Sequence, residues 1–138
     1  MQVSEIMHKG IISVQIGDSL KHVASIMKKE DIGSLPVYKY ERPVGFVTDR
    51  DIVVHCVSQG TSPDMPVSLA MSSENIICIR EGQDVAEAGK LMKDNQISRL
   101  LVVDKGDRPI GMVSLKDLSE NSDSKELKAD VITNIKRG

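Results

Sequence analysis

The sequence predicts an α+β fold made of two copies of one strand–helix–strand–strand–helix unit. The first observation behind this prediction is an internal repeat, in which residues 14–37 match residues 79–102. Self-similarity over such a length indicates a duplicated structural unit. The second observation is that short apolar runs in both copies flank a segment whose apolar residues recur at helical spacing. The third is that each copy ends with a hydroxyl residue three positions before an aspartate.

The first copy has clear signals for each of its elements. Ser19 follows a Gly-Asp turn and can cap a helix, because serine readily accepts a hydrogen bond from the first helical turn. Leu20, Val23 and Met27 then fall on one helical face. Two apolar runs around a polar connection predict a hairpin. In order, we expect a strand at 11–16, a helix from Leu20, strands at 35–38 and 44–47, and a helix at 50–58 that Gly60 can end.

The second copy repeats this pattern. Asp84 is the predicted helix cap, and Val85, Ala88 and Met92 form the apolar stripe of the helix. We expect a strand at 76–79, a helix from Val85, strands at 100–103 and 110–113, and a short helix from Asp117. Gly45 and Gly111 lie in matching strands, and glycine within a strand indicates close approach of another backbone.

The repeat defines the predicted domain boundaries. We expect the first domain at 1–62, the second at 63–121 and a C-terminal tail at 122–138. A short additional match, residues 4–7 with residues 68–71, lies near the start of each domain. Leu127, Val131 and Ile135 are spaced four apart in the tail, which predicts a modest amphipathic helix there.

Composition excludes several classes of protein. The chain of 138 residues has a net charge of −2, which argues against a nucleic-acid binder that relies on bulk electrostatics. No apolar run approaches the roughly 18 residues that a membrane span needs. The N-terminus shows no basic leader followed by an apolar stretch. We therefore expect a cytoplasmic protein that is not inserted in a membrane.

The metal-ligating residue types show no ligand spacing. His8, His22 and His55 are scattered, and Cys56 and Cys78 form no Cys-x-x-Cys motif. We expect no metal site and interpret both cysteines as small buried hydrophobic residues, because free cysteine is among the most buried residue types.

The hydroxyl–aspartate endings are the candidate site. Thr48 and Asp51 end the first copy, and Ser114 and Asp117 end the second. A hydroxyl at a helix N-terminus can donate to a phosphate beside free backbone N–H groups, and a carboxylate can accept hydrogen bonds from the vicinal hydroxyls of a ribose. The alternative is that these residues are simple caps and first-turn acids. Their duplication at matching positions favours nucleotide binding.

The repeated unit resembles a CBS (cystathionine beta-synthase) domain, and residues 1–120 resemble a tandem CBS pair, or Bateman module. The resemblance rests on the G-h-x-T/S-x-x-D endings and the I-x-x-h-P/h-V strands before them. It implies two pseudo-symmetric units packed through their sheets, with clefts for AMP, ADP, ATP or S-adenosylmethionine. It also implies a regulatory, non-catalytic module that forms a homodimer through the helices at 50–58 and 117–121 and acts on an effector protein that the sequence does not identify.

The resemblance assigns residues to each part of the ligand. Asp51 and Asp117 would hold the ribose, whereas Thr48 and Ser114 would reach the phosphate. Arg50, Lys116 and Arg99 are candidate phosphate cations. The expected adenine pockets are lined by Gly33, Ser34, Leu35, Pro36, Val37, Ile97, Ser98, Leu100, Ser13, Val14, Ile16, Cys78 and Ile79.

Arg99 makes the two predicted clefts unequal, because Ser34 occupies the matching position of the first copy. By the pseudo-symmetry of the family, we expect Arg99 to serve the cleft of Asp51 and to favour phosphorylated ligands there. Two other functions remain open. An enzyme acting on nucleotides would need a nucleophile or a general base with a matched partner, which the sequence does not show. A structural dimerisation module would have its clefts filled by side chains.

Overall fold

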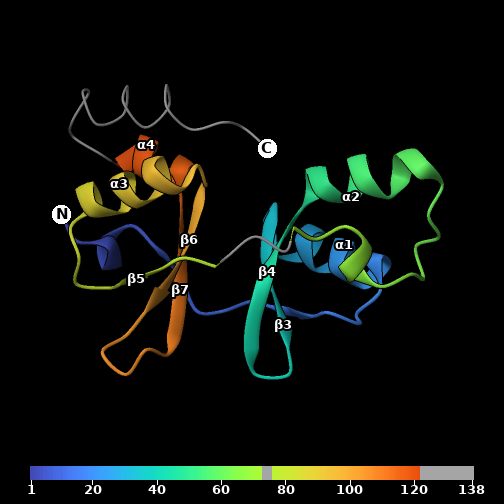
Figure 1. Cartoon of the computed structure of the whole chain (residues 1–138), viewed down its shortest axis with the longest axis horizontal. Coiled ribbons are helices and arrows are strands. Elements are labelled where there is room, and N and C mark those ends of the chain that lie inside the picture. The colour runs from blue at the N-terminus through green and yellow to red at the C-terminus, as the bar shows by residue number, and fades with distance from the viewer. Residues whose placement is uncertain (73–75, 122–138) are drawn as a thin grey trace. The chain divides into compact units, whose positions relative to one another are not determined.

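The computed structural model describes residues 1–72 and 76–121 (Figure 1). It confirms the α+β class and the repeated strand–helix–strand–strand–helix order. The elements are the 3-10 helix η1 (Val3–Glu5), β1 (His8–Lys9), β2 (Val14–Gln15), α1 (Leu20–Glu30), β3 (Ser34–Lys39), β4 (Arg42–Thr48), α2 (Asp49–His55), the 3-10 helices η2 (Val57–Gln59) and η3 (Val67–Leu69), β5 (Cys78–Arg80), α3 (Val85–Asn95), β6 (Arg99–Val103), β7 (Pro109–Ser114) and α4 (Leu115–Asn121). The helix predicted in the tail falls outside the described residues.

The chain forms two compact units whose boundaries differ from those of the repeats. We call Ile12–Ile76 the middle unit, and Met1–Ile11 together with the chain from Ile77 onward the terminal unit. The first eleven residues therefore pack with the second repeat rather than with the first. The segment that precedes the second repeat, which contains η3, packs in turn with the middle unit.

The middle unit has a three-stranded sheet in the order β2-β3-β4. Strand β2 runs parallel to β3, and β3 forms an antiparallel hairpin with β4 in which Leu35 lies opposite Val47. Parallel pairing of β2 and β3 requires a crossover, which α1 supplies. The unit has its own hydrophobic cluster, in which Val67 of η3 packs with residues of α1 and the sheet.

The terminal unit has a four-stranded sheet in the order β1-β7-β6-β5. Strands β5 and β6 are parallel and β6 and β7 form the antiparallel hairpin, as in the middle unit. The N-terminal strand β1 adds an antiparallel edge, with His8 opposite Met112 and Lys9 opposite Gly111. Val3 of η1 is fully buried in the hydrophobic cluster of this unit. Figure 1 shows α3 and α4 lying side by side within it.

The predicted helix caps are confirmed. The Ser19 hydroxyl accepts a hydrogen bond from the His22 N–H at 3.1 Å, and the Asp84 carboxylate accepts one from the Ala86 N–H at 2.9 Å. Both long helices end on a residue in the left-handed conformation, Asp31 (φ 53°) after α1 and Gln96 (φ 52°) after α3. A left-handed residue commonly ends a helix, and the same geometry occurs in both repeats.

Several sequence expectations need correction. The predicted strand at 11–16 is shorter, because only Val14–Gln15 pairs with β3. The predicted helix at 50–58 ends at His55 and continues as η2, which Gly60 ends at φ 72°. Helix α4 begins at Leu115 rather than at Asp117, since Ser114 occupies the capping position.

The prediction for Cys78 is also wrong, because its side chain is exposed, whereas that for Cys56 is confirmed. Partial desolvation, and to a lesser extent the nearby Asp107 carboxylate, raise the pKa of the Cys78 thiol above its ordinary value. A raised pKa leaves less of the nucleophilic thiolate at neutral pH. Cys78 is therefore exposed without being an activated thiol.

Close backbone approach at the two strand glycines is confirmed. A Cβ on Gly111 would lie 2.4 Å from the carbonyl oxygen of His8, and one on Gly45 would lie 2.3 Å from that of Ser72. His8 and Ser72 follow η1 and η3, respectively. Gly111 and Gly45 therefore let the segment after each of these 3-10 helices pack closely against the second strand of the hairpin, β7 or β4. Glycine at these two positions is what allows the segments to dock.

Candidate functional site

The first candidate site lies where β4 passes into α2. The Asp51 N–H donates to the Thr48 hydroxyl oxygen at 3.0 Å, and the Thr48 N–H donates to Asp51 Oδ2 at 2.9 Å. This reciprocal pairing is a capping box, which satisfies two N–H groups that a helix start leaves without partners. The capping role considered for these residues is therefore confirmed.

The second candidate site repeats this geometry where β7 passes into α4. The Asp117 N–H donates to the Ser114 hydroxyl oxygen at 3.1 Å, and the Ser114 N–H donates to Asp117 Oδ2 at 2.8 Å. The distances agree with those of the first site to within 0.1 Å. Two segments of different sequence thus hold a hydroxyl and a carboxylate in the same relation.

Capping leaves part of each pair able to bind something else. Each hydroxyl oxygen accepts a hydrogen bond from the aspartate N–H, so its own hydrogen remains a donor. Each carboxylate uses Oδ2 in the cap, so Oδ1 is the oxygen directed elsewhere. The cap therefore fixes a donor and an acceptor side by side, an arrangement suited to a polyhydroxylated ligand.

A histidine lies next to each Oδ1, but from a different element. In the middle unit, His55 of α2 follows Asp51 by one helical turn, and its Nε2 is 3.8 Å from Asp51 Oδ1. In the terminal unit, His8 of β1 places its Nε2 at 3.2 Å from Asp117 Oδ1. The side chain of Asp51 is 18% exposed and that of Asp117 is 11% exposed. Sequence reasoning missed His8, since the two residues are 109 positions apart in the sequence and no local pattern indicates their contact.

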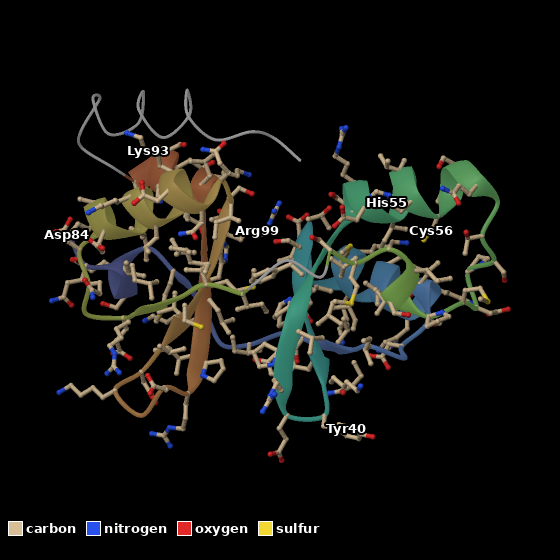
Figure 2. The ribbon with its side chains drawn as sticks, viewed as in Figure 1. Tyr40, His55, Cys56, Asp84, Lys93 and Arg99 are labelled. Atoms are coloured by element: carbon tan, nitrogen blue, oxygen red, sulfur yellow. The ribbon has the colours of Figure 1, made fainter. Side chains whose placement is uncertain are left out.

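The candidate phosphate cations differ in position. Arg50 is exposed on α2, and Lys116 is exposed on α4, where its Nζ lies 3.9 Å from Glu120. Arg99 lies directly opposite Ser114 in the β6–β7 hairpin, and its Nη1 donates to the Ser98 hydroxyl oxygen at 2.9 Å (Figure 2). The structure therefore brings Arg99 next to the terminal-unit site. The assignment of Arg99 to the cleft of Asp51 stays a prediction.

The residues predicted to line the adenine pockets fall into two groups. The buried ones are Val14, Leu35, Pro36, Val37, Ile79 and Leu100, and all except Pro36 are members of the two hydrophobic clusters. Their side chains stabilise the fold, so they could contact a ligand only through their backbone. The partly or fully exposed ones are Ser13, Ile16, Gly33, Ser34, Cys78, Ile97 and Ser98.

One charged neighbour distinguishes the middle-unit site. Asp49 is the first residue of α2, and its carboxylate approaches Gly33, where a Cβ would lie 3.1 Å from Oδ2. The matching residue of α4 is Leu115. The middle-unit site therefore carries one more carboxylate than the terminal-unit site. The sequence shows this difference between Asp49 and Leu115, but the hydroxyl–aspartate motif does not include the position.

Comparison with known proteins agrees with the repeat. A family model described as the CBS domain matches residues 3–58 and 64–123. The chain belongs to the CBS domain family. CBS domain-containing protein YhcV of Bacillus subtilis (strain 168) is 33% identical over 133 residues, which are 96% of this chain and 94% of that protein. Uncharacterized protein MK0525 of Methanopyrus kandleri is 33% identical over 119 residues, 86% of this chain but 61% of that longer protein.

Solved CBS pairs share the architecture. The CBS domain pair of protein MJ0100 has a TM-score of 0.72 and 27% sequence identity, with coverage of 87% of this chain and 94% of that chain. That protein was crystallised in complex with 5′-methylthioadenosine and S-adenosyl-L-methionine.

In the part of the chain that the structure describes, no helix combines the length and apolar character needed to cross a membrane. The described ranges, 1–72 and 76–121, contain no group of three or more His, Cys, Asp or Glu residues placed to hold a metal ion. The sequence-based expectation of no metal site stays a prediction.

Proposed function

We propose that this CBS pair is a regulatory module that binds an adenosine-containing ligand and relays its occupancy to a partner protein. The observation that carries the proposal is the same hydroxyl–carboxylate pair at the end of the hairpin in both units. A similar pair of domains, 27% identical, was crystallised with two adenosine compounds, which supports this ligand class.

The chemistry of the site divides the ligand into parts. Asp51 and Asp117 accept hydrogen bonds from the ribose hydroxyls through Oδ1, while the cap holds Oδ2. Thr48 and Ser114 donate to the 5′ substituent. The ligands that we propose, AMP, ADP, ATP and S-adenosylmethionine, share adenosine and differ only beyond the 5′ carbon, so groups near the hydroxyls set the preference among them.

Regulation follows if the ligand binds one arrangement of the module better than another. A ligand shifts an equilibrium only by its difference in affinity for the two states. We propose that the output acts through a separate effector and that the module itself does not catalyse a reaction.

A thermal-shift panel tests this function. We expect one or more of AMP, ADP, ATP, S-adenosylmethionine and 5′-methylthioadenosine to raise the unfolding midpoint, with GTP as the control. A ligand at 100 times its dissociation constant stabilises by about 2.7 kcal/mol, which for a chain of this size is a shift of several degrees at roughly 3–4 °C per kcal/mol.

The matched variants are Asp51→Asn and Asp117→Asn. Asparagine can still accept the cap hydrogen bond, but it places an amide donor where Oδ1 would accept a ribose hydroxyl. The double variant should keep its midpoint without ligand and lose the ligand-induced shift. A shift of undiminished size in the double variant would refute the role of the two carboxylates.

The same panel examines Arg99. In Arg99→Ala we expect weaker binding of AMP, by about 1.5–3 kcal/mol for a lost hydrogen bond between charged groups, with adenosine affinity unchanged. Equal losses for AMP and adenosine would remove the phosphate role.

A structural dimerisation module is the second candidate, and the capping boxes favour it because they give the motif a structural purpose that needs no ligand. The absence of a shift with every adenosine compound would support this alternative.

We also propose that the chain forms a homodimer through the surface of α2 and η2. Val53, Val54 and Val57 are exposed there, at 57%, 44% and 65%, and together form an apolar surface. Contiguous exposed apolar surface indicates an interaction site. The variant Val53→Asp/Val57→Asp should be monomeric by sedimentation velocity, with Tyr40→Asp on the β3–β4 turn as an exposed control (Figure 2). Retention of the dimer in the double variant would place the interface elsewhere.

A further inference from the structure

The two carboxylates of the proposed ligand sites differ in how open they are. In the terminal unit, Ser114 N–H donates to Asp117 Oδ2 at 2.8 Å, and His8 Nε2 lies 3.2 Å from Oδ1, within hydrogen-bond reach. In the middle unit, His55 Nε2 lies 3.8 Å from Asp51 Oδ1, beyond that reach. Both carboxylate oxygens of Asp117 therefore have a contact within the protein. In the middle unit, by contrast, His55 lies too far from Asp51 Oδ1 to form a hydrogen bond with it.

We propose that His8 covers the ribose-binding oxygen of Asp117, so that a ligand in the terminal unit must displace the imidazole. This inference rests on the proposed function. The Asp117 side chain is 11% exposed, so little of its carboxylate remains open once His8 is in place. The His8 side chain is 72% exposed, so the imidazole can turn away without disturbing the core.

His8 is held in place by the pairing of its strand with the hairpin of the terminal unit. His8 lies in β1, which pairs with β7 and follows η1, and the Gly10 N–H donates to the Ile110 carbonyl at 2.8 Å. His8 thus belongs to the N-terminal segment, residues 1–11, that packs in the terminal unit. In the repeat, Ser72 occupies the position that matches His8, so the preceding segment of the middle unit has a serine rather than a histidine at this place.

The expected result is an unequal pair of sites. Asp117→Asn leaves the middle-unit carboxylate intact, and Asp51→Asn leaves the terminal-unit carboxylate intact. By calorimetric titration with 5′-methylthioadenosine, which carries no phosphate for Arg99 or Asp49 to act on, the Asp117→Asn protein should bind more tightly than the Asp51→Asn protein.

Removing the cover should then strengthen the weaker site. In the Asp51→Asn background, His8→Ala should lower the dissociation constant about two- to fivefold, a modest factor because the histidine is largely exposed and such pairs are weak. His22→Ala, which changes an exposed histidine of α1, is the matched control and should leave the dissociation constant unchanged. An unchanged or higher dissociation constant in His8→Ala would overturn the inference.

A measurement on the otherwise native protein guards against a variant that disturbs β1. The NMR resonances of the His8 ring should move on addition of 5′-methylthioadenosine, and those of His22 should stay in place. Ligand binding without any movement of the His8 resonances would also overturn the inference. Failure of AMP and 5′-methylthioadenosine to bind the native protein or any variant would instead refute the proposed function, and the inference with it.

Discussion

Val3→Asp is expected to destabilise the terminal unit by at least about 3 kcal/mol, although the residue lies near the N-terminus. Val3 is fully buried in the hydrophobic cluster of that unit, and its N–H donates to the Gln83 carbonyl at 2.8 Å. The substitution loses roughly 1.5–3 kcal/mol of apolar burial and adds the cost of a carboxylate without a partner in an apolar site.

The repeat supplies a matched variant for the other unit. Val67 of η3 is equally buried in the middle unit, and its N–H donates to the Asp18 carbonyl at 2.7 Å. Val67→Asp should therefore lower stability to a similar extent. Leu69→Asp, at a half-exposed position two residues further on, is the control and should have little effect.

Urea denaturation gives the size of each effect, and hydrogen exchange gives its location. Faster amide exchange in β6 and β7 is expected for Val3→Asp, and in β3 and β4 for Val67→Asp. Faster amide exchange in β3 and β4 for Val3→Asp would instead contradict the packing of residues 1–11 in the terminal unit.

The packing of residues 1–11 with the second repeat is a feature that the sequence alone does not predict. The match of residues 4–7 with residues 68–71 indicates that both repeats have the same preceding element, but a match cannot tell on which unit each copy packs. The proposed boundary at 62/63 describes the repeats, whereas the compact units are divided near Ile12 and Ile76. Packing partners are set by the path of the folded chain, which is not encoded in local patterns.

Local features were predicted well for the converse reason. The caps at Ser19 and Asp84, the two hairpins and the Thr48–Asp51 pairing all depend on residues within a few positions of one another. The exposure of Cys78 and the contact of His8 with Asp117 depend on residues far apart in the sequence, and both escaped prediction. At the candidate site, the sequence thus indicates the local hydroxyl–aspartate pairing, but not the residues that contact it from elsewhere in the chain.

The second large effect is expected for Gly111→Val, which tests the docking of the N-terminal segment and its link to the site. A Cβ at this position would lie 2.4 Å from the His8 carbonyl oxygen and 3.0 Å from Met7 Sδ. A backbone atom cannot yield as a side chain can, so β1 must move away from β7. Overpacking of this kind costs about 1–3 kcal/mol and occasionally more, and we expect the upper end for the branched valine.

The control for this variant is Gly82→Ala, because a Cβ there meets no atom within 4 Å. Urea denaturation should show a large loss of stability for Gly111→Val and little change for Gly82→Ala. A Gly111→Val protein as stable as the control would mean that β1 does not occupy the place described.

The smaller substitution Gly111→Ala connects this packing to ligand binding. It should displace β1 enough to carry His8 away from Asp117 while leaving the terminal unit folded. If His8 covers the carboxylate, Gly111→Ala should bind 5′-methylthioadenosine more tightly in the Asp51→Asn background even though it is less stable. Stability and affinity would then change in opposite directions, which general damage to the fold does not produce. A loss of both would show that β1 supports the site rather than covers it.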